Sequence, residues 1–286
     1  MKKRLQVNVS GGRTSAYMAH WLKENKSSEY EMVFIFANTG FEHPDTLRFL
    51  NDVDKHFGLG LVWVESVVNP GRRGTTHKIV SFETANRNGQ PFRDVIEKYG
   101  LPNQSYKHCN REMKFNPMTS YVRKEKGWKK GTYDLALGIR SDEKRRVSET
   151  AENQRVIYPL VHMNPVDKSF ILDWFNQFEW DLTIPEYLGN CLTCYKKSDK
   201  KLNLVYQYDP LSFNFFREME RKFGDKKPPT DPTPGPRKIF RNHRSVDDMI
   251  NLFNYIGPVM KYDDEMDSGG CSESCEGLEM TSLALA

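Results

Sequence analysis

The chain lacks any hydrophobic run long enough to span a membrane. Its 286 residues contain no stretch of about 18 consecutive apolar residues, so no transmembrane helix is expected. No internal repeat is visible, and the net charge of +4 is too small to indicate nucleic-acid binding by itself. The basic start, Met-Lys-Lys-Arg, leads into an apolar strand and a glycine turn instead of a signal-peptide core. We therefore expect a cytoplasmic protein with one large domain, or one domain and a small appendage.

A glycine turn follows the first expected strand, and the Gly-Lys-Ser/Thr of a Walker A motif is absent from it. The turn reads Ser-Gly-Gly and leads directly into an expected helix. Glycines let the backbone approach an anion closely, and the free N–H groups of a first helical turn point at it, so the pattern favours a phosphate or sulfate ester as ligand. An ordinary helix entry capped by Ser10 or Thr14 is the alternative. The candidate nucleotide-binding residues of this segment are Ser10, Gly11, Gly12, Arg13, Thr14 and Ser15.

Strands and helices alternate along the chain. The expected strands span residues 5–9, 32–37, 61–65, 133–139 and 156–160. The expected helices span residues 14–25, 44–57, 91–99, 111–125, 167–178, 198–208, 211–223 and 245–255, and residues 72–90 form a less regular region. This βαβ pattern predicts an α/β fold with a doubly wound, mostly parallel sheet and helices on both faces. Ligands of such sheets bind at the carboxyl ends of the strands. The candidates that directly follow a strand are Ser10, Asn38, Thr39 and Arg140.

Composition divides the chain into three expected segments. Residues 1–188 form a nucleotide-binding α/β domain, residues 189–262 a helical region with a Cys-x-x-Cys motif, and residues 263–286 a flexible, cysteine-bearing tail. A proline-rich stretch at 228–236 predicts an extended loop or linker inside the second segment.

The chain has only five cysteines, Cys109, Cys191, Cys194, Cys271 and Cys275. Two thiolates at Cys-x-x-Cys spacing can chelate one metal or occupy two corners of a cluster. A redox dithiol and inert thiols are the alternatives. Cys109 is the candidate third ligand because it lies at an expected strand-to-helix junction, and Cys271 or Cys275 is the candidate fourth ligand.

Several segments, in order, resemble the phosphoadenosine phosphosulfate (PAPS) reductase-like group of the adenine nucleotide alpha-hydrolase superfamily, whose phosphate loop is called the PP-loop. They are Ser-Gly-Gly-x-x-Ser at 10–15, Asn-Thr-Gly-Phe-Glu-His-Pro-Asp-Thr at 38–46, Cys-x-x-x-x-Lys at 109–114, Gly-Ile-Arg at 138–140 and Tyr-Pro-Leu at 158–160. The resemblance implies ATP or an adenylyl sulfate (PAPS or APS) as ligand, with Mg²⁺ as a candidate companion ion. It adds Asn38, Thr39, Gly40 and Arg140 to the nucleotide site. Thr14 departs from the group, which usually has Asp at this position.

The cysteine segments extend the resemblance. Residues 189–198 resemble the cysteine segment of phage and bacterial PAPS reductase-like proteins, and relatives that carry clusters occur among tRNA thiolation and DNA phosphorothioation enzymes. The resemblance implies a [4Fe–4S] cluster, with zinc as the alternative. Sulfonucleotide reductases carry a nucleophilic cysteine in a C-terminal Glu-Cys-Gly segment, and residues 273–277 read Glu-Ser-Cys-Glu-Gly. Cys275 is therefore a candidate nucleophile.

Three functions remain open on the sequence. The first is an ATP-dependent enzyme that transfers sulfur from a cluster, with nucleic acid or a sulfur-donor protein as candidate partner. The second is a thiol-dependent sulfonucleotide reductase, and the third is a non-catalytic nucleotide-binding module with structural zinc. Arg140 and Cys275 are the candidate catalytic residues. Clusters of Lys and Arg, such as residues 72–73 and 144–146, are compatible with a polyanionic partner or with ordinary solvated surface.

Overall fold

The computed structural model describes residues 2–227, 234–241 and 243–260. The strands are β1 (Lys3–Asn8), β2 (Tyr30–Asn38), β3 (Val62–Val67), β4 (Thr76–Val80), β5 (Asp134–Ala136) and β6 (Val156–Ile157). The helices of the first half are α1 (Arg13–Lys26), α2 (Pro44–Phe57), α3 (Gln90–Tyr99), α4 (His108–Asn110), the π-helix η1 (Arg111–Phe115) and α5 (Asn116–Lys124). Those of the second half are η2 (Ser141–Arg146), α6 (Pro159–His162), α7 (Lys168–Phe175), η3 (Glu186–Leu188), α8 (Asp199–Tyr208), η4 (Pro210–Ser212), α9 (Phe213–Phe223) and α10 (Val246–Ile256). Within the described residues, none of these helices has the length and apolar character that crossing a membrane requires.

The six strands form one sheet in the order β4-β3-β2-β1-β5-β6. Pairing is parallel throughout except between β3 and β4, which run antiparallel. The chain moves outward from β1 in one direction through β2 and β3, and returns to the other side of β1 through β5. The order therefore reverses between β1 and β5, and this is where ligands bind in open α/β sheets. The predicted doubly wound, mostly parallel α/β fold is confirmed.

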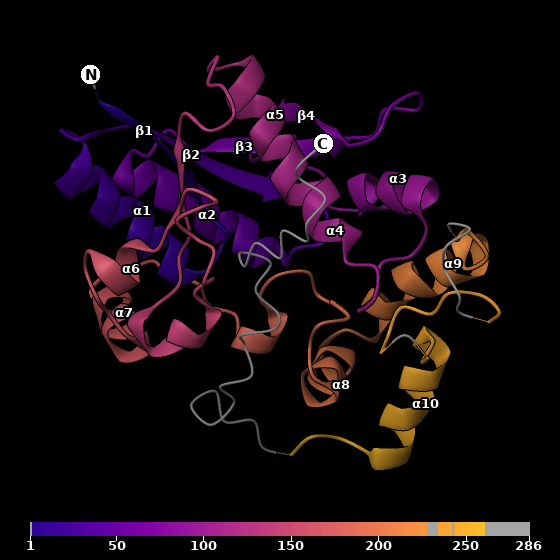
Figure 1. Ribbon diagram of the computed structural model, residues 1–286. Coiled ribbons are helices and arrows are strands. Elements are labelled where there is room, and N and C mark those ends of the chain that lie inside the picture. Colours follow the sequence, from indigo (N-terminus) through magenta and orange to yellow (C-terminus); the bar gives the residue numbers. More distant parts are fainter. Residues whose placement is uncertain (1, 228–233, 242, 261–286) are drawn as a thin grey trace.

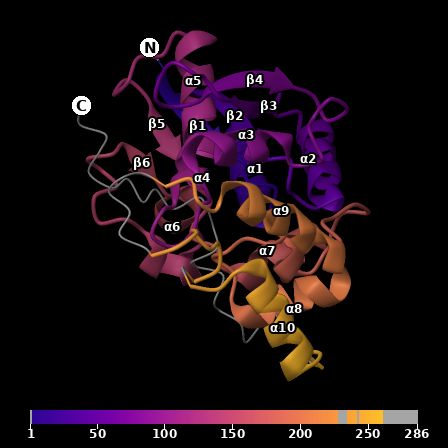
Figure 2. The same cartoon turned by 90° about the vertical axis from the view of Figure 1, so that its right-hand side faces the viewer.

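Helices cover both faces of the sheet (Figure 1 and Figure 2). Alternate residues of β2 point to opposite faces, as the two-residue period of a strand requires. Phe34 and Phe36 join a large core with α1, α2 and α3, whereas Val33 and Ile35 join a smaller core beneath α5. Residues of α8, α9 and α10 belong to the large core too. The C-terminal helices therefore pack directly against the α/β fold of the first half.

Three local expectations were wrong. Residues 76–80, inside the region expected to be irregular, form the edge strand β4. The strands expected at 133–139 and 156–160 are only three and two residues long, because their pairing with neighbours ends early and Pro159 begins α6. The helix expected at 111–125 begins with five residues of π-helix.

Candidate functional site

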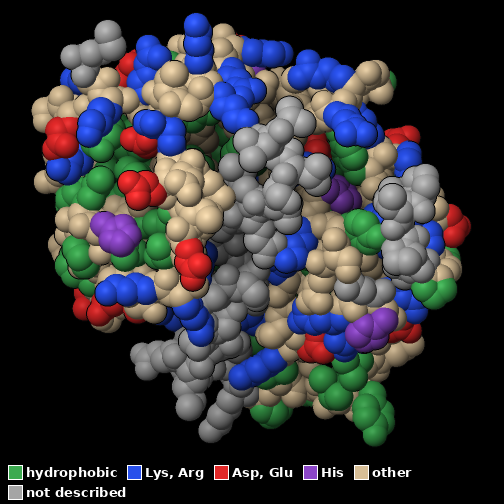
Figure 3. Space-filling model, viewed as in Figure 1, with side chains coloured by type: hydrophobic (Ala, Val, Ile, Leu, Met, Phe, Trp, Pro, Cys, Tyr) green, Lys and Arg blue, Asp and Glu red, His purple; other side chains and the backbone are tan. Residues whose placement is uncertain are grey.

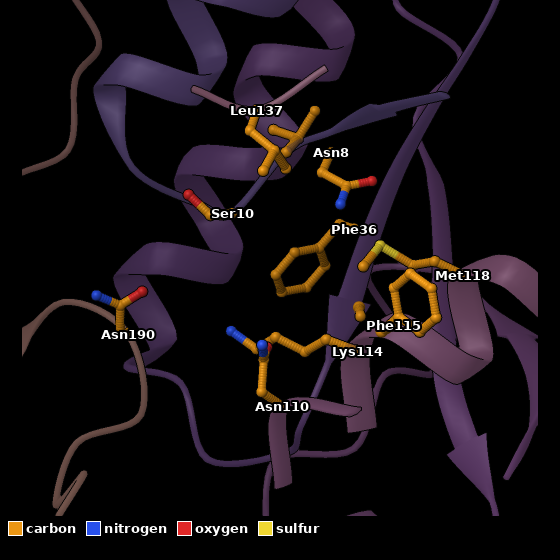
Figure 4. A pocket seen from close by; sticks show the side chains of 11 residues that line it. Asn8, Ser10, Phe36, Asn110, Lys114, Phe115, Met118, Leu137 and Asn190 are labelled. Atoms are coloured by element: carbon orange, nitrogen blue, oxygen red, sulfur yellow. The ribbon is translucent and has the colours of Figure 1, made fainter. Parts of the chain in front are cut away.

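A pocket opens at the carboxyl ends of β1 and β2, next to the point where the strand order reverses. The empty space in it, including open solvent at its mouth, is about 530 Å³. Asn110 and Lys114 lie on one side of it and Leu137 on the opposite side (Figure 4). The residues that line it are Asn8, Val9, Ser10, Phe36, Ala37, Asn110, Lys114, Phe115, Met118, Leu137 and Asn190.

The N terminus of α1 lies beside this pocket and is open. Gly12 is the N-cap residue, the first turn holds no acidic residue, and within the described residues no side chain or carbonyl accepts its first three amides. The Ser15 hydroxyl accepts the Ser10 amide and donates to the Gly12 carbonyl, each at 3.0 Å, which fixes the shape of the turn. An uncapped helix N terminus with its partial positive charge is suited to an anion.

The two glycines of the turn have different roles. Gly11 has φ +92°, and a Cβ there would lie 2.5 Å from Cγ2 of Thr46 on α2, so only glycine fits. Gly12 has an extended backbone, with φ −98° and ψ 157°. A Cβ on Gly12 would have only the Ser10 hydroxyl nearby, at 3.9 Å. Gly11 therefore allows α1 and α2 to approach, whereas a side chain at Gly12 would project into open space.

Arg140 is brought to the same turn from the far side of β1. Its Nη1 lies 3.3 Å from the Thr14 hydroxyl, and its Nε and Nη2 both donate to the Asp142 carboxylate at 3.0 Å. Gly138 permits this approach, because a Cβ there would lie 3.1 Å from the Ser15 Cα. The structure thus places a fixed guanidinium group against the predicted phosphate turn.

The Arg13 side chain forms an ion pair with Asp181. Its Nε lies 2.7 Å from Oδ1 of Asp181, its Nη2 lies 2.8 Å from Oδ2, and it also donates to the Leu182 carbonyl. This bidentate pair joins the start of α1 to the segment after α7. A nucleotide contact from Arg13 therefore remains a prediction for its backbone amide.

The hydrogen-bond donors of the loop after β2 are bonded to acceptors within the protein. The buried Glu42 carboxylate accepts the Thr39 hydroxyl at 2.7 Å, the Thr39 amide at 3.1 Å and the Phe41 amide at 3.2 Å. The Asn38 amide group donates to Glu65 at 2.8 Å, and its oxygen accepts the Gly40 amide. The predicted nucleotide contacts of Asn38, Thr39 and Gly40 therefore stay untested, and their donors are engaged within the protein.

The Cys-x-x-Cys turn rests on this loop. Cys191 forms an antiparallel bridge with Glu42, the Leu192 amide donates to the Phe41 carbonyl, and the Cys191 sulfur lies 3.4 Å from the Thr39 hydroxyl. Asn190 precedes the turn with φ +56° and lines the pocket. The turn is therefore anchored next to the candidate nucleotide site.

Two cationic side chains donate hydrogen bonds to backbone carbonyls in and around the cysteine turn. The fully buried Lys197 ammonium donates to the Tyr187 and Leu192 carbonyls at 2.5 and 2.9 Å. The Arg241 guanidinium donates to the Tyr195 and Lys197 carbonyls at 2.8 and 2.6 Å. These hydrogen bonds fix the backbone of the turn and of the residues on either side of it.

Cys109 contacts the residue that follows the turn. Its sulfur lies 3.6 Å from the hydroxyl of Tyr195, the residue after Cys194. The neighbouring His108 is neutral at pH 7, because burial, helped by the charges of Arg111 and Arg237, lowers its pKa to about 4. The Tyr195 side chain therefore links Cys109 to the Cys-x-x-Cys segment, and a shared metal site for the three cysteines stays a prediction.

The cysteine set is partial within residues 2–227, 234–241 and 243–260. Cys191 and Cys194 are buried thiols on one turn, but in this part of the chain no group of three or more His, Cys, Asp or Glu side chains is close enough to hold a metal. Cys271 and Cys275, the predicted fourth ligand and candidate nucleophile, lie outside the described residues.

Of the residues that line the pocket, only Ser10 was predicted as a site residue, and the polar residues missed are Asn8, Asn110, Lys114 and Asn190. Asn110 and Lys114 come from α4 and η1, and Asn190 from the segment before the cysteine turn. The spacing from Cys109 to Lys114 was a signal, but the π-helix that turns the lysine to the pocket was not predicted. Single π-helical turns occur frequently at functional sites.

A family model and several relatives match this chain. The model of the phosphoadenosine phosphosulfate reductase domain matches residues 4–174. The nin region protein ORF290 of Escherichia phage lambda is 30% identical over 283 residues, which cover 94% of this chain and 93% of that protein. Protein MJ0973 of Methanocaldococcus jannaschii is 24% identical over 237 residues, which cover 77% of this chain and 48% of that protein, so the match spans about half of that relative.

Two solved structures show weaker similarity. The PAPS reductase of Candida auris, in a phosphate complex, has a TM-score of 0.36 and 16% identity, covering 60% of this chain and 71% of that chain. The U34-tRNA thiolase NcsA of Methanococcus maripaludis, with its [4Fe-4S] cluster, has a TM-score of 0.41 and 15% identity, covering 91% and 84%. The family model and the phage relative decide the assignment: the chain belongs to the phosphoadenosine phosphosulfate reductase domain family.

Proposed function

We propose that this protein is an enzyme that binds an adenine nucleotide, ATP or an adenylyl sulfate, at the N terminus of α1 and uses its cysteines in sulfur transfer. One observation carries the proposal. A single pocket is lined by Ser10 of the phosphate turn, by Asn110 and Lys114 next to Cys109, and by Asn190 next to Cys191. A nucleotide and the sulfur chemistry would therefore share one site.

The nucleotide-binding part of the proposal rests on charge and on open donors. The first amides of α1 and the Ser10 hydroxyl would bind a pyrophosphate or phosphosulfate group. The Arg140 guanidinium, held against Thr14, would contact the same anion from β5, and the Lys114 ammonium would contact it from the pocket wall. Mg²⁺ would bind through the nucleotide phosphates.

With ATP, the proposed reaction is an adenylation followed by displacement. An oxygen of the acceptor attacks the α-phosphorus, and pyrophosphate leaves with the electrons of the broken P–O bond. A sulfide ion, delivered by a separate sulfur donor and held at the cysteine region, then attacks the activated carbon, and AMP leaves with the electrons of the broken C–O bond. Each step exchanges one bond for another without net oxidation. The α1 amides, Arg140 and Lys114 stabilise the charge of the departing pyrophosphate.

The cysteines form the second part of the proposal. Cys109, Cys191 and Cys194, with Cys271 or Cys275, are the proposed ligands of a [4Fe–4S] cluster. The residues present fit such a group in chemistry, since two thiols share one turn and the Lys197 and Arg241 cations donate to its backbone. The fourth ligand is proposed to be exchangeable, so that its release would leave a cluster held by three thiolates that binds sulfide. Zinc would instead make the site a structural one.

A second candidate is a sulfonucleotide reductase, favoured by the family itself. In that reaction a thiolate attacks the sulfur of a bound adenylyl sulfate, the adenosine phosphate leaves, and a further thiol releases sulfite. Cys275 is the proposed nucleophile. The two candidates differ in which nucleotide the turn accepts and in which cysteine is essential.

One experiment distinguishes them. The full chain is purified without oxygen, its iron and zinc are quantified and its visible spectrum is recorded, and ATP, APS and PAPS are titrated by calorimetry. The sulfur-transfer proposal expects iron with a brown chromophore and tighter ATP binding, and Cys191→Ser removes the chromophore. Preference for APS or PAPS together with loss of activity in Cys275→Ser establishes the reductase. Absence of binding to all three nucleotides overturns both.

A further inference from the structure

Exposed Lys and Arg side chains lie on segments that adjoin the pocket lining on two sides. One set lies on the loop between β3 and β4 and on the α4–η1 segment, and the other lies on η2. We call these side chains the basic rim. It consists of Arg72, Arg73, Lys107, Arg111, Lys144 and Arg145, all of them exposed.

Both sides of the basic rim are fixed to pocket-lining segments. The Thr75 amide and hydroxyl donate to the Glu112 carboxylate and carbonyl at 3.0 and 2.5 Å, so the β3–β4 loop rests on η1, whose Lys114 lines the pocket. On the other side, Leu137 lines the pocket three residues before Arg140, the N-cap of η2. The two sets of cations therefore lie on segments that adjoin opposite walls of the pocket, those of Lys114 and Leu137.

The carboxylates of the same segments are engaged locally. Glu112 is buried and accepts from Asn116 and Arg111. Asp142 accepts from Arg140, and Glu143 accepts from Arg146 at 2.7 Å. Positive charge therefore predominates at the pocket mouth, where it attracts a polyanion.

We infer that the basic rim binds the phosphate backbone of an unpaired nucleic-acid strand and presents one of its bases to the pocket as the sulfur acceptor. This inference rests on the proposed function, which leaves the acceptor unnamed. Cations spaced along two segments match the repeated charges of a phosphate backbone, whereas a small anion would use only one or two of them. The strand is unpaired because a base stacked inside a duplex cannot enter a pocket.

The chain offers a matched control. A second group of exposed cations, Arg123, Lys124, Lys126 and Lys129, lies at the end of α5 and in the loop that leads to β5. Because β5 runs parallel to β1, this loop lies at the amino edge of the sheet, opposite the pocket. Figure 3 shows Lys and Arg side chains gathered along the edge of the molecule over α5 and β4. These cations carry the same charge but border no pocket residue in the lining set.

The test compares two fourfold neutralisations in the full-length, anaerobically purified protein. One variant carries Arg72→Gln, Arg73→Gln, Lys107→Gln and Lys144→Gln, and the control carries Arg123→Gln, Lys124→Gln, Lys126→Gln and Lys129→Gln. Affinity for a fluorescent single-stranded RNA is measured by anisotropy across a range of salt concentrations. We expect the first variant to lose affinity by at least ~30-fold and its log–log salt slope to fall by about 3, while the control changes less than ~3-fold.

Several outcomes would overturn the inference. They are equal losses in the two variants, binding of a duplex or of polyglutamate as tight as that of the single strand, and no binding of any nucleic acid. A DNA strand of the same sequence tells which sugar the site prefers, and preference for either strand over the duplex supports the inference. Calorimetry with ATP separates the two proposals: wild type that binds ATP but no strand refutes the rim alone, whereas wild type that binds no adenine nucleotide refutes the proposed function.

Discussion

The loops after β1 and β2 occupy equivalent places in the sheet but are built in opposite ways. The turn at residues 10–15 leaves the first amides of α1 without acceptors among the described residues. The loop at 38–42 instead binds its own amides with the Glu42 carboxylate, and His43 caps the helix that follows by accepting the Asp45 amide. Two neighbouring strand ends with similar polar sequences thus differ. One leaves its amides open, as the proposed anion site requires, and the other is a closed loop that supports the cysteine turn.

The difference shows that position at a strand end does not by itself make a ligand contact. What distinguishes the two loops is whether a nearby carboxylate has already taken the donors. An acidic residue three positions after Thr39 is visible in the sequence, and the absence of any acidic residue from the first turn of α1 is visible as well. Substitutions in each loop should therefore affect different properties, nucleotide affinity in one and folding stability in the other.

The largest expected effect is a loss of nucleotide affinity in the variant Gly12→Val. The extended backbone at Gly12 accepts a β-branched residue, and its Cβ meets only the Ser10 hydroxyl, so the fold should persist. The valine side chain would exclude phosphate from the helix N terminus, and we expect nucleotide affinity to fall by at least ~100-fold, or about 2.7 kcal/mol. Calorimetry with ATP measures this loss.

Gly71→Val is the matched control, because a Cβ at Gly71 meets nothing within 4 Å and its φ is not in the left-handed region. It should leave affinity unchanged. Gly11→Ala gives the opposite pattern to Gly12→Val, since its Cβ would collide with Thr46 and its φ is +92°. Unfolding at lower urea concentration, not weaker binding by folded protein, should mark that variant. Unchanged affinity in Gly12→Val would remove the turn from the nucleotide site.

The second expected effect is a loss of folding stability in the variant Glu42→Gln. It replaces the carboxylate that accepts the Thr39 hydroxyl and the Thr39 and Phe41 amides. We expect the free energy of unfolding to fall by about 1–3 kcal/mol, because buried donors lose an acceptor, and nucleotide affinity to change less than ~3-fold. Urea unfolding and calorimetry measure the two quantities.

Glu31→Gln, at the exposed start of β2, is the control and should alter stability by less than about 0.5 kcal/mol. Because the cysteine turn rests on the loop, alkylation of Cys191 should also become faster in Glu42→Gln than in the control. A large loss of nucleotide affinity without a loss of stability would mean that the two loops do not differ as described.

The sequence predicted the parts of this comparison that are local. The glycines of the first turn, the strands β1 and β2 and the helices α1 and α2 were placed within a few residues, because buried periodicity and turn residues determine them. The edge strand β4 was missed because its Thr-His-Lys-Ile-Val sequence has only a weak alternation and depends on pairing with β3. The Arg13–Asp181 pair joins residues 168 positions apart, and no local pattern reveals it. The role of Glu42 likewise became clear only with the contacts of its carboxylate.

The third expected effect is a smaller loss of nucleotide affinity in the variant Arg140→Lys. Lysine keeps the charge but loses the planar fork that binds Asp142 through two nitrogens while Nη1 contacts Thr14. We expect about a 10-fold loss of nucleotide affinity, or about 1.4 kcal/mol, with little change in stability. Arg155→Lys, which alters another Arg–Asp pair at the start of β5, is the control. Equal affinities for Arg140→Lys and wild type would place Arg140 outside the anion site.

The smallest expected effect is a pH dependence of the closed loop. Burial lowers the pKa of His43 below its ordinary 6.5, against the opposing charges of Asp45 and Asp209. The neutral ring is required, since Nδ1 accepts the Asp45 amide at 3.1 Å while Nε2 lies 3.0 Å from the Tyr208 hydroxyl. Below pH 6.5 the unfolded chain binds a proton at this site more readily than the folded chain, so acid lowers the free energy of unfolding.

His43→Asn isolates this contribution, because asparagine can still cap α2 but does not titrate in this range. Its stability relative to wild type should rise by about 0.5–1 kcal/mol between pH 7.5 and pH 5.5, and the comparison cancels the other histidines. Urea unfolding at the two pH values measures the change. Nucleotide affinity at the open turn should not follow it, since α1 has no such cap. If the difference in the free energy of unfolding between variant and wild type stayed constant with pH, His43 would not need to be neutral. The start of α2 would then be stabilised by Glu42 and its loop alone.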